Sequence, residues 1–148
     1  MISSSGSCAH LIRSRAIPSR EAGAPRYLLR DRTFASRGGP DPEPPEEAAI
    51  SAVTLCGLHH GVLVAGARQR AGRLATLAYA ERRFAVLPVD ARVAPHYGRL
   101  LAGRRRGSKA RLHTADALIA ATAAAYDLPL FTRDRDFKGL DGVDVVLA

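Results

Sequence analysis

Short β-prone runs alternate with helix-periodic segments from Ile50 to the end of the chain. Leu55, Leu58 and Val62, for example, fall on one face of a helix. Strands that alternate with helices indicate crossover connections, which join parallel strands. We therefore predict an α/β fold, a three-layer α/β/α sandwich whose central, mostly parallel sheet is covered by helices on both faces.

The boundaries of the expected strands and helices follow from the residues at which each apolar pattern begins and ends. The expected strands cover residues 50–53, 84–89, 130–132 and 143–147. The expected helices cover residues 54–63, 70–83, 93–103 and 114–126. Thr54 is a candidate N-cap of the first helix, because a hydroxyl side chain can accept a hydrogen bond from a free N–H of the first turn.

Composition changes sharply near residue 46. Ser, Arg, Gly and Pro dominate the preceding part, and residues 38–45 (GGPDPEPP) exclude regular structure. Within that part, the run Tyr27-Leu28-Leu29 has the character of a buried strand. We predict a poorly ordered basic arm over residues 1–45, with a remnant first strand within residues 27–34, followed by one domain over residues 46–148. An alternative is that residues 1–45 are not a genuine N-terminus.

The chain carries 22 Lys and Arg against 14 Asp and Glu, a formal net charge of +8. This excess favours a polyanionic partner, either nucleic acid or an acidic protein segment. The base composition of a genome can also make its proteins rich in Arg and Ala, and would then produce the same excess. Cys8 and Cys56 form no CxxC pair, so a reducing cytoplasm is the expected location. Apolar runs stay well short of the roughly 20 residues that cross a bilayer, so we expect no membrane partner.

Three polar segments are expected beyond the carboxyl ends of the strands, where ligands bind in parallel sheets. They are residues 114–116, which begin a helix, residues 132–137, which follow a strand, and residues 55–60, which begin another helix. The first two segments supply Asp116, Asp134 and Asp136. Two converging carboxylates could hold Mg²⁺, a cation that takes oxygen ligands.

Each of these residues also has a purely structural explanation. Asp116, in a first helical turn, complements the helix dipole, which contributes about 0.3–1 kcal/mol. Asp134 and Asp136 are typical turn residues, whose side chains bond to nearby backbone. The adjacent His59 and His60 point to different faces of a helix, so we do not expect them to form a metal-binding pair.

Three segments resemble, in order and spacing, motifs of the PIN-domain ribonucleases of the VapC toxin type. Residues 50–62 (ISAVTLCGLHHGV) are similar to the second motif of that family, residues 114–123 (TADALIAATA) to its third, and residues 130–140 (LFTRDRDFKGL) to its fourth. The resemblance covers roughly residues 46–148 and implies a PIN-like three-layer α/β/α fold.

The resemblance also implies a function. It implies an endoribonuclease that uses Mg²⁺ or Mn²⁺, is inhibited by a small antitoxin protein and forms a homodimer. Asp116 matches the third acidic residue and Asp134 the fourth, so both are expected as catalytic residues and metal ligands, with Asp136 as an auxiliary metal ligand. The expected contacts to RNA phosphates lie in a basic loop and are Ser108, Lys109 and Arg111.

The chain departs from the family pattern at two acidic positions. Gly57 stands where the second motif has Glu. The first motif, an apolar strand ending in Asp, falls near Leu29. The simplest register places Arg30 at the acidic position, and a one-residue shift places Asp31 there as a metal ligand. Arg30 would oppose a bound cation, so we predict reduced metal affinity.

These departures leave two functions open. The first is a Mg²⁺-dependent endoribonuclease, the toxin component of a toxin–antitoxin pair, weakened by the loss of one or two carboxylates from its active site. The alternative is a catalytically inactive PIN-like protein that binds RNA or an antitoxin.

Overall fold

The computed structural model describes residues 26–30, 47–105 and 112–147. Five parallel strands form one sheet in the order β3-β2-β1-β4-β5. The strands are β1 (Tyr27–Leu29), β2 (Ala48–Ser51), β3 (Ala85–Leu87), β4 (Leu130–Thr132) and β5 (Val145–Leu147). The helices are α1 (Ala52–Leu63), α2 (Ala67–Arg83), α3 (Val93–Arg105) and α4 (Thr114–Ala125), and η1 (Arg135–Phe137) is a short 3₁₀ helix.

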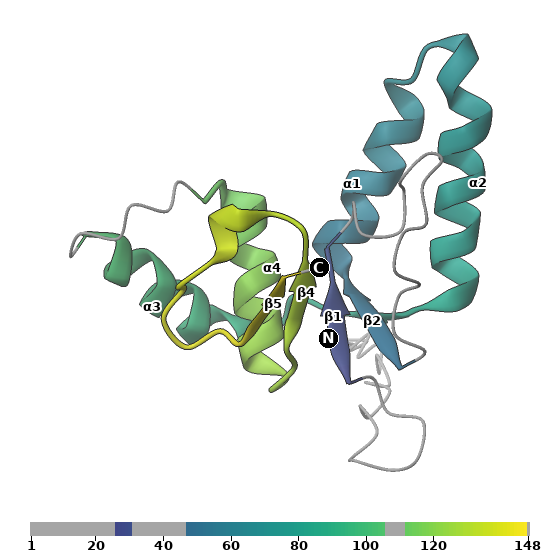
Figure 1. Ribbon diagram of the computed structural model, residues 1–148. Coiled ribbons are helices and arrows are strands. Elements are labelled where there is room, and N and C mark those ends of the chain that lie inside the picture. The colour runs from purple at the N-terminus through teal and green to yellow at the C-terminus, as the bar shows by residue number, and fades with distance from the viewer. Residues whose placement is uncertain (1–25, 31–46, 106–111, 148) are drawn as a thin grey trace, which may run out of the picture.

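Helices cover both faces of the sheet, with α1 and α2 on one side and α3 and α4 on the other (Figure 1). Adjacent residues of a strand point to opposite faces, and the fully buried Leu28 and Leu29 of β1 illustrate this. Leu28 belongs to the core that contains α3 and α4, whereas Leu29 packs with Ala80 of α2 and with Phe84. The predicted three-layer α/β/α sandwich with a parallel sheet is confirmed.

Strand β1 lies in the middle of the sheet, because it pairs with β2 on one side and with β4 on the other. Leu29 is in register with Ile50 of β2 and with Phe131 of β4. A strand covered on both faces and paired on both edges is expected to be continuously apolar, as this one is. The residue that follows, Arg30, therefore leaves the sheet at its centre, on the edge where the carboxyl ends of the strands meet.

Helix α1 begins earlier than its sequence pattern predicts. The strand was expected to run to residue 53 with Thr54 as the N-cap, but β2 ends at Ser51 and α1 starts at Ala52. Ser51 has extended backbone, and its Oγ accepts a hydrogen bond from the Thr54 backbone N–H at 3.1 Å. Ser51 is therefore the N-cap, and the assignment of Thr54 was wrong. Both hydroxyl groups are buried and lie 3.2 Å apart, so Thr54 supports the cap from inside the helix.

Helix α4 places its first turn at the carboxyl edge of the sheet. It connects to β4 in a parallel sheet, so it runs against the strand direction. Ala117, Ala120 and Ala121 are fully buried, and their small side chains allow the helix to lie close to the sheet. None of the described helices is long and apolar enough to cross a membrane.

The loop between β3 and α3 is attached to the other end of α4. The Arg92 guanidinium binds the Asp90 carboxylate at 2.7 Å and donates to the Tyr126 hydroxyl at 2.9 Å. It also lies 4.6 Å from the centre of the Tyr126 ring. The hydrogen bond from Arg92 holds the pKa of Asp90 below its ordinary value, and burial raises the pKa of Tyr126. This cluster fixes the C-terminal end of α4, whereas the polar site described next lies at its first turn.

Candidate active site

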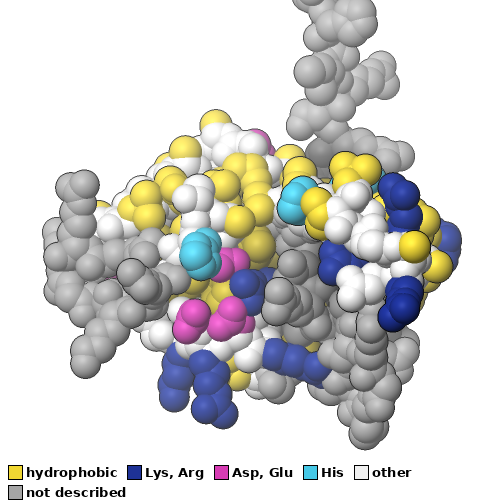
Figure 2. Space-filling view, turned by 90° about the horizontal axis from the view of Figure 1, so that it is seen from above, with side chains coloured by type: hydrophobic (Ala, Val, Ile, Leu, Met, Phe, Trp, Pro, Cys, Tyr) yellow, Lys and Arg dark blue, Asp and Glu magenta, His cyan; other side chains and the backbone are white. Residues whose placement is uncertain are grey.

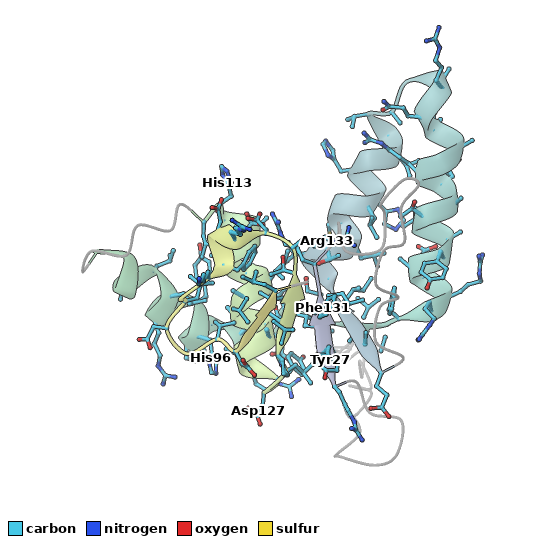
Figure 3. The ribbon with its side chains drawn as sticks, viewed as in Figure 1. Tyr27, His96, His113, Asp127, Phe131 and Arg133 are labelled. Carbon is cyan, nitrogen blue, oxygen red and sulfur yellow. The ribbon has the colours of Figure 1, made fainter. Side chains whose placement is uncertain are left out.

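Polar residues from β1, α4 and β4 meet at the carboxyl edge of the sheet. Arg30 follows β1 directly, Asp134 lies two residues after β4, and Asp116 lies in the first turn of α4. Figure 3 labels His113 and Arg133 at this edge and Asp127 at the opposite one. Seen from above, acidic side chains gather around a basic one at this edge, with a histidine beside them (Figure 2). The predicted convergence of Asp116 and Asp134 is therefore present in the structure.

The Arg30 guanidinium joins the two carboxylates. Its Nε and Nη2 both donate to Oδ1 of Asp116, at 3.2 and 2.9 Å. Its Nη1 donates to Oδ2 of Asp134 at 2.5 Å. All three guanidinium nitrogens are thus engaged with residues that lie 86 and 104 positions away in the chain. Such charge-assisted bonds are short and roughly twice as strong as neutral ones.

Arg30 is held in this position by its own strand and by an aromatic ring. Its backbone N–H donates to the Phe131 carbonyl of β4 at 3.4 Å, which continues the pairing of β1 with β4. The Arg30 Cζ lies 4.9 Å from the centre of the Phe137 ring, a favourable cation–π arrangement. Phe137 is fully buried, so it forms a fixed support for the guanidinium. No local pattern in the sequence indicates this role of Phe137.

Asp134 is oriented by the turn that follows β4. Its backbone N–H donates to Oγ1 of the buried Thr132 at 3.1 Å. Its Oδ1 accepts the backbone N–H of Asp136 at 2.9 Å, which makes Asp134 the N-cap of η1. Asp136 contributes this backbone N–H, and its side chain is exposed. One oxygen of Asp134 therefore caps the turn, as its structural explanation predicts, and the other binds Arg30.

Asp116 is the most enclosed of the three charged side chains. It is 14% exposed, compared with 17% for Arg30 and 31% for Asp134. As the only acidic residue in the first turn of α4, it also complements the positive end of the helix dipole. In such a partly enclosed place an unpaired charge is costly, so the ion pairs with Arg30 matter for the fold as well as for the site.

In the arrangement described, Arg30 binds the two carboxylates that could otherwise hold a divalent metal ion. Within residues 26–30, 47–105 and 112–147, no group of three or more His, Cys, Asp or Glu side chains is placed to hold one. The two carboxylates that converge are already bound to a guanidinium, which stays protonated in proteins. The simplest register of the first motif therefore brings a cation, Arg30, to the place where the resemblance implies an acidic ligand.

Four of the predicted site residues lie outside the described residues and stay predictions: Asp31, Ser108, Lys109 and Arg111. The histidines of α1 are described, and Nε2 of His59 lies 3.2 Å from Oε1 of Glu81 on α2. His59 thus contacts the neighbouring helix, and its neighbour His60 is exposed.

Gly57 is an exposed residue of α1, one turn beyond Val53. Val53 packs against the core that contains α4. Residues four apart share a helix face, so a side chain at position 57 would start from the α4 side of α1. The glycine lacks the positive φ of Gly139 and Gly142, so it does not depend on a backbone conformation that only glycine adopts.

We expect Gly57→Ala to raise the free energy of unfolding by about 1 kcal/mol, because a helix-interior glycine has excess freedom in the unfolded chain. Thermal or urea unfolding measures this effect. Gly61→Ala in the same helix is the matched control. A Cβ there would lie 3.3 Å from Arg73 Nη1, which donates to the Gly61 carbonyl, so a smaller gain is expected. Equal gains at both positions would contradict this account of α1.

The fold and the site together define a class of protein, an α/β/α domain with acidic residues at the carboxyl edge of a parallel sheet. A family model described as PIN domain matches residues 28–143. Ribonuclease VapC4 of Mycobacterium tuberculosis is 34% identical over 112 residues, which are 76% of this chain and 85% of that protein. Ribonuclease VapC5 of the same organism is 40% identical over 99 residues, or 66% and 72% of the two chains.

Solved structures with this fold include VapBC-5 of Mycobacterium tuberculosis, a member of the VapBC family of toxin–antitoxin systems. It matches with a TM-score of 0.70 and 32% identity, over 82% of this chain and 98% of that chain. This chain belongs to the PIN domain family. The resemblance to VapC-type PIN-domain ribonucleases, predicted from three motifs, is confirmed.

Proposed function

We propose that the chain is the VapC-type component of a toxin–antitoxin pair, directed at RNA, with a strongly weakened capacity for metal-dependent RNA cleavage. Two relatives named as ribonucleases and a toxin–antitoxin structure of the same fold support the first part. One observation carries the second part: Arg30 binds both Asp116 and Asp134 at the centre of the site.

RNA as the target agrees with the charge of the chain. The formal net charge is +8, and a positive surface attracts the phosphate backbone whatever the base sequence. His113 and Arg133 both lie at the carboxyl edge of the sheet (Figure 3). We propose that the basic loop with Ser108, Lys109 and Arg111 adds further phosphate contacts. We also propose a small antitoxin protein as partner, a homodimer and a cytoplasmic location, which the family resemblance supports.

A second candidate is a fully active Mg²⁺- or Mn²⁺-dependent endoribonuclease. The observation that favours it is that Asp116 and Asp134 still converge at the carboxyl edge of the sheet. In this function they are the catalytic residues and metal ligands, with Asp31 as a further metal ligand and Asp136 as an auxiliary one. It requires the Arg30 side chain to leave both carboxylates, which breaks the ion pairs that now bridge them.

One assay of RNA binding and cleavage distinguishes the two candidate functions. We expect the purified protein to bind fluorescently labelled RNA. With Mn²⁺ we expect it to cleave a mixed RNA pool at least about 10-fold more slowly than ribonuclease VapC5 does in the same assay. This ratio of rates corresponds to about 1.4 kcal/mol in the activation free energy. Cleavage as fast as that of VapC5, silenced by EDTA and by Asp116→Asn, would establish the fully active enzyme instead. A protein that neither binds nor cuts RNA would overturn both candidates.

A further inference from the structure

We infer that the Arg30 guanidinium takes the place of a divalent cation in this site, so that the carboxylate pair is bridged, and half of its charge cancelled, from within the chain. The inference rests on the proposed assignment of Asp116 and Asp134 as the acidic pair of a PIN site. The Arg30 side chain occupies the space between the two carboxylates and closes that space to metal ions.

The geometry of Arg30 resembles that of a bridging ion. One guanidinium contacts Oδ1 of Asp116 through two nitrogens and Oδ2 of Asp134 through the third. The planar guanidinium presents several N–H donors in a fixed arrangement, so it can bind two carboxylates from one position. A carboxylate oxygen directed at Arg30 cannot also be directed at a metal ion in the same place.

The charges of the site lead to the same conclusion. Two carboxylates carry two negative charges, and Arg30 cancels one of them in a setting where each side chain is at most about a third exposed. A divalent ion added beside the guanidinium would meet a fixed positive charge at close range. Since Arg30 cannot lose its proton, only movement of the whole side chain could admit the ion.

The surroundings of Arg30 oppose such a movement. The Phe137 ring lies against the guanidinium, and this ring is fully buried. The second oxygen of Asp134 is committed to the backbone N–H of Asp136, so this carboxylate has a fixed direction. Leaving the site would cost Arg30 at least its three hydrogen bonds to the two carboxylates and its contact with the Phe137 ring.

The test is a calorimetric titration of the full chain with Mn²⁺, without RNA, for the wild type and Arg30→Asp. We expect weak binding at most to the wild type and a Mn²⁺ affinity at least 10-fold higher for Arg30→Asp. The melting temperature provides a second readout, because a ligand that binds only the folded state raises it. Millimolar Mn²⁺ is expected to raise the melting temperature of Arg30→Asp and to leave that of the wild type unchanged.

Two further variants make the outcome decisive. Arg68→Asp makes the same charge change in the exposed first turn of α2, where an acidic residue suits the helix dipole, and is expected to behave like the wild type. Arg30→Gln removes the charge but keeps a polar side chain, so it tests the inference if Arg30→Asp fails to fold. It is expected to bind Mn²⁺ more tightly than the wild type does.

Stoichiometric Mn²⁺ binding by the wild type, as tight as that of the Arg30 variants, would overturn the inference. So would the absence of any gain in Mn²⁺ affinity in both Arg30→Asp and Arg30→Gln. Since the titration contains neither RNA nor an antitoxin, its result does not depend on whether the proposed function is correct. A protein that fails to bind RNA but gains Mn²⁺ binding on loss of Arg30 would overturn only the function.

Discussion

Replacing Arg30 with Met is expected to lower the free energy of unfolding by about 2–3 kcal/mol at neutral pH, between the values for exposed and for fully buried ion pairs. The variant keeps most of the apolar length of the side chain but removes the guanidinium that binds both Asp116 and Asp134. Both carboxylates are partly enclosed, so water can only partly replace the lost bonds. Urea unfolding of the wild type and the variant gives the difference directly.

A double-mutant cycle separates repulsion from simple loss of contacts. If the unpaired carboxylates cause the destabilisation, Arg30→Met combined with Asp116→Asn is expected to be more stable than Arg30→Met alone, because one of the two stranded charges is gone. A loss below about 0.5 kcal/mol on Arg30→Met would show that Arg30 behaves like an ordinary surface side chain. In that case the bonds of Arg30 would have little influence on either the fold or the site.

The fold could be predicted largely from local patterns. Apolar residues at strand and helix spacing are visible without knowledge of the tertiary structure, which is why the layers and the parallel sheet were predicted correctly. The boundary between β2 and α1 was not predicted correctly, because Ser51 and Thr54 are both good N-cap residues. The choice between them depends on how far β2 pairs with β3, where Ser51 is in register with Leu87. That pairing joins distant segments, and no local pattern shows it.

The candidate site was predicted less completely than the fold. Asp116 and Asp134 could be named because their motifs are specific, and the register that places Arg30 at an acidic position was recognised. That one side chain binds both carboxylates depends on contacts across 86 and 104 residues, so only the structure shows it. Phe137 was missed for a similar reason. In the sequence it is a lone aromatic residue in a charged turn, and its role depends on the place of Arg30 above its ring.

Restoring acidic residues at both altered positions should change activity more than any single substitution. We expect Arg30→Asp combined with Gly57→Glu to raise Mn²⁺-dependent RNA cleavage at least about 100-fold over the wild type, equivalent to about 2.7 kcal/mol of barrier. The first change removes the fixed positive charge from between Asp116 and Asp134. The second adds a carboxylate from the side of α1 on which Val53 faces the core with α4. Initial cleavage rates on one RNA pool, with and without EDTA, measure the gain.

The matched control for this double variant is Arg30→Asp combined with Gly57→Ala. It has the same change at position 30 and the same relief of the helix-interior glycine, but it lacks the second carboxylate. If the Glu side chain reaches the site, the Glu variant should cut RNA faster than the Ala variant and bind Mn²⁺ more tightly. Equal rates and equal affinities would mean that position 57 does not face Asp116, and the alignment of residues 50–62 with the second motif would then be wrong. Adding Asp116→Asn to the Glu variant should return cleavage to the wild-type level, because the gain depends on a carboxylate that the natural chain already holds in place.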